Sequence, residues 1–134
     1  MPLEVEILIP NRLLVQEQVD ELNVPGVLGY LGVLPGHTAF LSTLGEGVLM
    51  YRQGETRHYM TIFGGHMEVN NDKVTILADL SEPAREIDRS RAEAARDRAE
   101  ERLRRFDDSA TDFERAHAAL YRALIRLQVA TKAS

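Results

Sequence analysis

The chain has 134 residues, 44% of them hydrophobic and 28% charged, as expected for one globular domain or a domain with an appendage. It has no cysteine, which excludes disulfides and thiolate metal sites. Residues 1–81 carry a net charge of −6 and residues 82–134 a net charge of +1, so nucleic-acid binding is not expected. The first residues lack the pattern of a signal peptide, and no apolar stretch approaches the roughly 20 residues that span a bilayer. We therefore expect a soluble, intracellular protein.

The first part of the chain has the pattern of short strands separated by turns. All nine glycines lie between Gly26 and Gly65. Residues 3–9, LEVEILI, alternate apolar and acidic side chains, which predicts a half-buried strand.

Two hairpins are predicted further along this part. Residues 47–63 form one pair of strands that turns around Gly54, and residues 66–79 form another that turns around Asn71. Strands of this length at such intervals predict a β-sandwich or a barrel.

The second part has helical periodicity and no glycine. From Ile87 onward, small or apolar residues recur at spacings of three and four, at Ala92, Ala95, Ala99, Leu103 and Phe106. Pro83 is suited to the first turn of this helix, because its missing N–H costs nothing there.

A second helix is predicted after a break at residues 107–112. Thr111 and Glu114 have the spacing of a capping box, which marks a helix start. Its predicted apolar stripe is Phe113, Ala116, Leu120, Leu124 and Leu127. The two helices form an antiparallel hairpin that is only marginally stable alone, so we expect it to pack against the sandwich.

His37 is the first candidate for chemistry, since it follows Pro35-Gly36 in the stretch GYLGVLPGHTAF. No H-x-x-x-H or H-x-H pair, G-x-S-x-G elbow or glycine-rich phosphate loop accompanies it. A structural or contact histidine is the favoured interpretation, and no catalytic or metal site is predicted. A small β-sandwich enzyme using His37 is the alternative.

The arginines of the helical part are the second candidate. One face of the first helix carries residues at alternating spacings of three and four: Asp88, Arg91, Ala95, Arg98 and Arg102. A hairpin bend near residues 108–109 would set Arg91 opposite Arg126 and Arg98 opposite Arg122. Four converging guanidinium groups would repel one another unless an anion lay between them, and arginine forks suit phosphate oxygens. A solvated face with helical ion pairs is the other interpretation.

Three ordered motifs resemble the epsilon subunit of bacterial F-type ATP synthase. They are G-x-x-G-x-L-P-G-H from Gly29 to His37, G-G-x-x-E-V from Gly64 to Val69, and V-T-I-L-A-D from Val74 to Asp79. The likeness extends from Glu4 to about Val129. It implies an all-β sandwich over residues 1–84 followed by a two-helix antiparallel hairpin over residues 85–134.

The resemblance implies a rotor subunit without catalytic activity. Its sandwich would bind the gamma subunit and the ring of c subunits, and its hairpin would extend toward the catalytic alpha/beta ring to inhibit ATP hydrolysis. The docking residues it implies are Gly29, Tyr30, Leu31, Gly32, Pro35, Gly36 and His37. The subunit would lie peripherally on the cytoplasmic face of the bacterial plasma membrane, in a proton-transporting complex.

Some epsilon subunits bind ATP through an I-D-x-x-R-A motif, which is present here from Ile87 to Ala92. The resemblance implies ATP as a regulatory ligand, with no obligatory cofactor, and does not specify whether Mg²⁺ accompanies it. The implied nucleotide-binding residues are Glu82, Ile87, Asp88, Arg91, Ala92, Arg98, Arg122 and Arg126. A free-standing nucleotide sensor is a further alternative.

Overall fold

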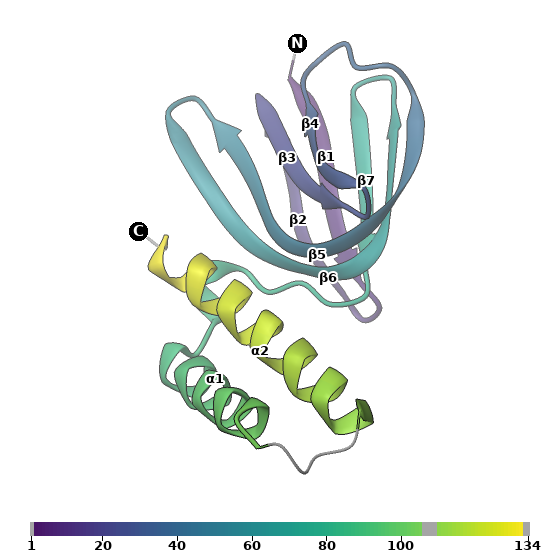
Figure 1. Ribbon diagram of the computed structural model, residues 1–134. Helices are drawn as coiled ribbons and strands as arrows, with labels where there is room; N and C mark the ends of the chain where they lie inside the picture. Colours follow the sequence, from purple (N-terminus) through teal and green to yellow (C-terminus); the bar gives the residue numbers. More distant parts are fainter. Residues whose placement is uncertain (1, 106–109, 133–134) are drawn as a thin grey trace.

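The computed structural model describes residues 2–105 and 110–132 (Figure 1). The strands are β1 (Leu3–Ile9), β2 (Arg12–Val19), β3 (Glu21–Gly26), β4 (Gly29–Val33), β5 (Phe40–Gln53), β6 (Thr56–Asn70) and β7 (Lys73–Ala78). They are followed by the short 3₁₀ helix η1 (Ala84–Glu86) and the helices α1 (Arg89–Leu103) and α2 (Ala110–Thr131). The expected order, a β part and then a helical hairpin, is confirmed.

The strands form one hydrogen-bonded sheet in the order β2-β1-β7-β6-β5-β3-β4. Strands β1 and β7 pair in parallel and the other neighbours pair antiparallel. The long strands β5 and β6 curve, so that the sheet folds over itself and both layers of the sandwich share them (Figure 1). The prediction of separate strands ending at residue 63 and starting at residue 66 was therefore wrong.

Gly64 and Gly65 allow β6 to continue through this bend. Their φ angles are +80° and +134°, which L side chains rarely adopt. A Cβ on Gly65 would lie 2.2 Å from the carbonyl oxygen of Leu77, and one on Gly64 would lie 2.7 Å from a carboxylate oxygen of Asp79. The paired glycines are thus required by the close approach of β7 and the segment after it.

Both predicted hairpin turns are confirmed. Gly54 has a φ of +60° between the paired residues Gln53 and Thr56. Asn71 and Asp72 have φ angles of +52° and +61° between β6 and β7, as a two-residue type I′ turn requires.

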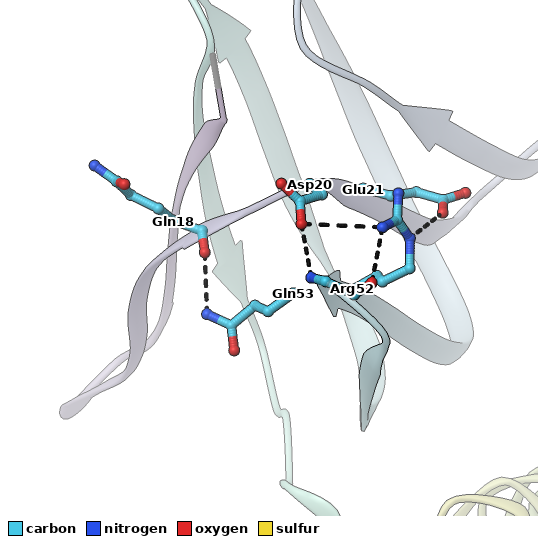
Figure 2. A network of polar contacts seen from close by, with 6 residues as sticks. Gln18, Asp20, Glu21, Arg52 and Gln53 are labelled. Carbon is cyan, nitrogen blue, oxygen red and sulfur yellow. Dashed lines mark hydrogen bonds and ion pairs between the residues drawn. The ribbon is translucent and has the colours of Figure 1, made fainter.

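One apolar cluster fills the sandwich, and every strand from β1 to β7 supplies at least one residue to it. The alternation predicted for residues 3–9 is confirmed, because Leu3, Val5 and Ile7 are fully buried. Arg52 on β5 forms a polar network with the residues at the start of β3 (Figure 2). It donates to Glu21 at 3.0 Å and lies 3.9 Å from Asp20.

The first helix begins later than the apolar spacing predicts. Pro83 precedes η1, and Asp88 is the N-cap of α1, its Oδ1 accepting a hydrogen bond from the backbone N–H of Arg91 at 3.1 Å. Pro83 therefore opens a short 3₁₀ turn instead of the long helix. It also forms an isolated bridge with Met60 of β6, which fixes this segment on the sandwich.

Helix α2 lies between α1 and the bend of β5 and β6 (Figure 1). Its Ile125 and Val129 pack with Val48 and Phe63 of the sheet in a second apolar cluster. The expectation that the hairpin packs against the sandwich is confirmed.

The predicted stripe of α2 was partly wrong, because Phe113 and Leu124 are 55% and 46% exposed. The helix buries two faces instead of one. Ile125 packs against the sheet, and Ala123, which points about 200° away from it around the helix, is also buried. Phe106 and the side chain of Thr111, and with it the capping box, lie outside the described residues; α2 begins at Ala110.

Candidate functional site

A cavity of about 330 Å³ lies where the two helices meet the segment that leaves the sandwich. It is lined by Glu82, Glu86, Ile87, Asp88, Arg91, Ala92, Ala95, Arg98 and Arg126. Seven of the eight residues expected to bind nucleotide are among them, and Arg122 is not. Binding of nucleotide by these residues stays a prediction.

Helical geometry explains how α1 presents its residues to the cavity. Arg91, Ala95 and Arg98 follow one another at spacings of four and three on α1, so they share a face. Asp88 uses one carboxylate oxygen to cap the helix, which fixes where that face begins. The positions of these α1 residues in the cavity wall therefore depend on the residue at which α1 begins.

Arg126 reaches the cavity from α2 and is held on two sides. Its Nε donates to a carboxylate oxygen of Glu82 at 2.7 Å, and its guanidinium lies 4.9 Å from the centre of the Phe63 ring. Both members of the ion pair are only about 30% exposed. The pair ties α2 to the segment between β7 and η1.

Arg122 does not line the cavity, contrary to the prediction. Its Nε donates to Glu46 of β5 at 2.9 Å, and its guanidinium lies 5.9 Å from the centre of the Phe63 ring. The prediction that four arginines converge on one level was therefore wrong: a carboxylate at the bend of the sheet holds one of them, and Glu82 neutralises another.

A further ion pair closes the cavity near η1. Arg12 of β2 donates through both terminal nitrogens to the two carboxylate oxygens of Glu86, at 2.9 and 2.6 Å. The hydrogen bond from Arg12 lowers the pKa of Glu86, and the same bond raises the pKa of Arg12. Glu86 is therefore already satisfied by a partner from the sandwich.

The pairing leaves Arg91 and Arg98 as the cations available to a ligand. Both are exposed, and neither forms an ion pair within residues 2–105 and 110–132. Ile87 and buried Ala92 add a small apolar wall beside them. Guanidinium donors next to an apolar wall suit a ligand that has both phosphate groups and a flat ring.

The expected docking residues occupy one edge of the sheet and the turn that follows. Strand β4 contains Gly29–Gly32 and pairs only with β3 within the described sheet. The N–H of His37 donates to the carbonyl of Leu34 at 3.2 Å, with Pro35 and Gly36 between them and a φ of +85° at Gly36. This is the pattern of a type II turn, so Pro35 and Gly36 each fit their position.

The glycines of this stretch do not share one backbone conformation. Gly29 and Gly36 have positive φ angles, whereas the φ angle of Gly32 lies in the range that other residues adopt. The N–H of Gly36 donates to Asp72 at 2.6 Å, which ties the turn to the β6–β7 hairpin. Tyr30 accepts a hydrogen bond from the N–H of Val48 at 3.0 Å.

Among the described residues, His37 contacts its own loop and the start of β5. Its Nδ1 lies 2.8 Å from the carbonyl oxygen of Thr38, and its ring lies 4.8 Å from that of Phe40. No group of three residues that could hold a metal ion occurs in the described part of the chain. These contacts favour a residue that braces the loop.

An exposed apolar face on the outside of the sheet was missed by the sequence analysis. Leu41 and Leu77 are 77% and 55% exposed and border a shallow cavity of about 310 Å³ together with His66. The alternation of the strand could have revealed this face, because Leu77 lies between the buried residues Ile76 and Ala78 and therefore points outward.

Family comparisons agree with this architecture. The model of the ATP synthase delta/epsilon chain, β-sandwich domain, matches residues 2–84, and that of the delta/epsilon chain, long α-helix domain, matches residues 85–131. The chain belongs to the epsilon-chain family of ATP synthase. Among the described residues, no helix is both long and apolar enough to span a membrane.

Individual epsilon chains match along nearly their whole length. The ATP synthase epsilon chain of Citrifermentans bemidjiense is 46% identical over 132 residues, which cover 98% of this chain and 96% of the relative. That of Syntrophobacter fumaroxidans is 49% identical over 130 residues, covering 97% and 96%. The resemblance found in the sequence motifs is thus confirmed.

Solved structures of ATP synthase contain a chain with the fold of this epsilon-family member. A chain in the Euglena gracilis mitochondrial ATP synthase, OSCP/F1/c-ring, has a TM-score of 0.80 at 25% identity and matches over 97% of this chain and 81% of its own length. A chain in the Tetrahymena thermophila central stalk and c-ring has a TM-score of 0.63 at 15% identity, which shows the fold alone.

Proposed function

We propose that this protein is a non-catalytic rotor subunit that joins the gamma subunit to the c-subunit ring at the cytoplasmic face of the membrane. Its hairpin inhibits ATP hydrolysis when it extends toward the alpha/beta ring, and ATP holds the hairpin folded. The observation that carries the regulatory part is the cavity between α1, α2 and Glu82, where Arg91, Arg98 and Arg126 meet.

The cavity exists only in the folded hairpin, because its walls come from both helices. ATP bound there would stabilise that conformation by mass action, by about 2.7 kcal/mol when its concentration is a hundred times its dissociation constant. Because the hairpin is also held by Arg126–Glu82 and by Arg122–Glu46, ATP adds to an existing docking energy instead of cancelling a repulsion.

Calorimetric titration of the full chain with ATP, ADP and GTP tests this regulatory role. We expect ATP to bind, and Arg98→Gln to weaken it by about tenfold or more, since a hydrogen bond to a charged group contributes about 1.5–3 kcal/mol. Arg104→Gln is the matched control, because Arg104 lies near the end of the same helical segment and pairs with Glu100 and Glu101. Absence of ATP binding, or equal losses in both variants, would refute the nucleotide site.

Docking to gamma is supported by the exposed apolar surface of the sandwich and by the type II turn beside it. A pull-down with the gamma subunit tests this part. We expect Leu41→Ser with Leu77→Ser to weaken the complex, because both side chains are large, apolar and more than half exposed. Leu124→Ser on α2 serves as the control, and an unchanged complex in the double variant would exclude this face as the interface.

A further inference from the structure

A second polar cavity, of about 260 Å³, lies between the β5–β6 hairpin, η1 and the end of α2. It shares no lining residue with the cavity lined by Arg91, Arg98 and Arg126. Three segments that are distant in the sequence therefore meet at a separate site.

This second cavity is lined by cations from each of the three segments. Arg57 comes from β6, Arg85 from η1, and Lys132 from the end of α2, while His58 lies beside Arg57. No acidic residue is among the lining residues. Three positive charges around one small cavity create a field that favours an anion.

Of the neighbouring acids, Glu17 accepts a hydrogen bond from Gln53 at 2.6 Å and keeps its negative charge near Tyr51. The other neighbouring acids are paired with arginines. Arg52, the cross-strand partner of Arg57, forms ion pairs with Glu21 and Asp20 (Figure 2). Arg57 itself forms no ion pair within the described ranges. Arg12 holds both carboxylate oxygens of Glu86.

The other cations of the cavity are also held only loosely. Arg85 has only a 3.9 Å contact with Glu86. Lys132 lies 4.9 Å from the centre of the Tyr59 ring, a contact that keeps its ammonium group at the cavity without neutralising it.

Tyr51 supplies a polar donor at the same cavity. Tyr51 is only 7% exposed as a residue and lines the cavity, where its hydroxyl oxygen is not enclosed. The ring stacks on His58 at 4.7 Å, which fixes its direction. Burial, and after it the nearby charge of Glu17, raises the pKa of Tyr51, while the charge of Arg85 opposes that rise, so the hydroxyl is a neutral donor.

We infer that this second cavity binds a small phosphate-bearing anion such as pyrophosphate or a compact phosphorylated metabolite. Its volume is below the roughly 300–1,000 Å³ of cavities that enclose drug-sized ligands, so it suits an anion smaller than ATP. Arg57 and Arg85 donate from planar forks, Lys132 adds a point charge, and Tyr51 donates its hydroxyl hydrogen. Because Lys132 arrives with α2, the bound anion joins the docked hairpin to the sandwich.

This inference does not depend on the proposed nucleotide site, and one titration separates the two. The full chain is titrated calorimetrically with pyrophosphate at low ionic strength and without Mg²⁺, before and after saturation with ATP. We expect Arg57→Gln and Lys132→Gln each to weaken pyrophosphate binding by about tenfold or more, and Tyr51→Phe to weaken it by about threefold. Arg98→Gln and Arg104→Gln remove one positive charge elsewhere and are expected to leave it unchanged, as is ATP.

Three results would overturn the inference. They are no binding of pyrophosphate at millimolar concentration, unchanged binding in both Arg57→Gln and Lys132→Gln, and loss of binding in Arg98→Gln or on saturation with ATP. The last result would assign the anion to the cavity between the helices instead. Arg57 and Lys132 are exposed, so the fold of each variant is expected to remain intact and circular dichroism checks it.

Discussion

Arg122 donates to Glu46 across the boundary between helix and sheet, with 2.9 Å between Nε and Oε2. Tyr121 supports the same contact by donating to the backbone carbonyl of Glu46 at 3.3 Å. Arg126, one turn further along α2, faces the cavity between the helices and pairs with Glu82. Two arginines that lie one turn apart on α2 therefore have different roles. Arg122 docks α2 on the sandwich, and Arg126 closes the candidate nucleotide site.

The first prediction follows from this division. Arg122→Ala should weaken ATP binding by less than Arg126→Ala or Arg98→Ala does, because Arg122 does not line the cavity. Calorimetry on the full-length variants measures the difference. Comparable losses in all three would mean that Arg122 leaves Glu46 when the nucleotide binds, and that the sequence-based assignment to the phosphates was right.

The comparison between sequence and structure is clearest at these arginines. Asp88 caps α1, and Arg91 and Arg98 lie on its first turns, so the helical periodicity placed these three residues correctly relative to one another. The partner of Arg122 is 76 positions away in the sequence, and no local period connects the two. The direction of Arg122 depends on where the bend of β5 places Glu46, which only the folded sheet determines.

The apolar stripe of α2 shows the same limit. Spacing predicted one buried face, as for a helix that packs on a single neighbour. The helix has two neighbours, so Ile125 is buried against the sheet while Leu124 next to it remains half exposed. The strands were easier to predict, because their alternation and their turn residues act within a few positions of one another.

The second prediction concerns the contact that docks the hairpin. Ile125→Ala removes a side chain that is 5% exposed and packs with Phe63, which should cost about 2 kcal/mol or more at a fully packed site. Since α2 is the main contact between hairpin and sheet, this loss should undock both helices and leave the sandwich folded. Hydrogen exchange should show lower protection in α1 and α2 alone. Leu124→Ala, at an exposed position, is the control, and unchanged protection in Ile125→Ala would contradict the proposed docking contact.

The third prediction concerns the bend of the sheet. Gly65→Ala places a Cβ 2.2 Å from the carbonyl oxygen of Leu77 on a backbone with a φ of +134°, so we expect a loss of at least about 2 kcal/mol in the free energy of unfolding. Gly32→Ala meets nothing within 4 Å and has an ordinary φ, so it is expected to be nearly neutral. Urea denaturation measures both. Similar stabilities would mean that the bend adapts to a side chain.

The fourth prediction is a pH dependence of the contact between Arg12 and Glu86. Because the hydrogen bond from Arg12 lowers the pKa of Glu86 below its usual value of 4.5, the pair stabilises the folded state above that pH. This contribution is lost as the pH falls through the lowered pKa. The stability difference between the natural chain and Glu86→Gln should therefore be largest near neutral pH and shrink on acidification below 4.5. A difference that grows in acid would show the opposite sign and refute the assignment.

The last prediction is that residues 1–84 fold without the hairpin. The main apolar cluster comes entirely from the strands, from Leu3 to Ala78, so removing the helices takes nothing from it. The second cluster behaves differently, because Val48 and Phe63 lose Ile125 and Val129 and become exposed. We therefore expect a chain ending at residue 84 to unfold cooperatively in urea, as the full chain does, and to self-associate at high concentration through the uncovered surface. Sedimentation compares the shortened chain with its Phe63→Ser variant, which should associate less. A shortened chain without cooperative unfolding would show that the sandwich depends on its helices.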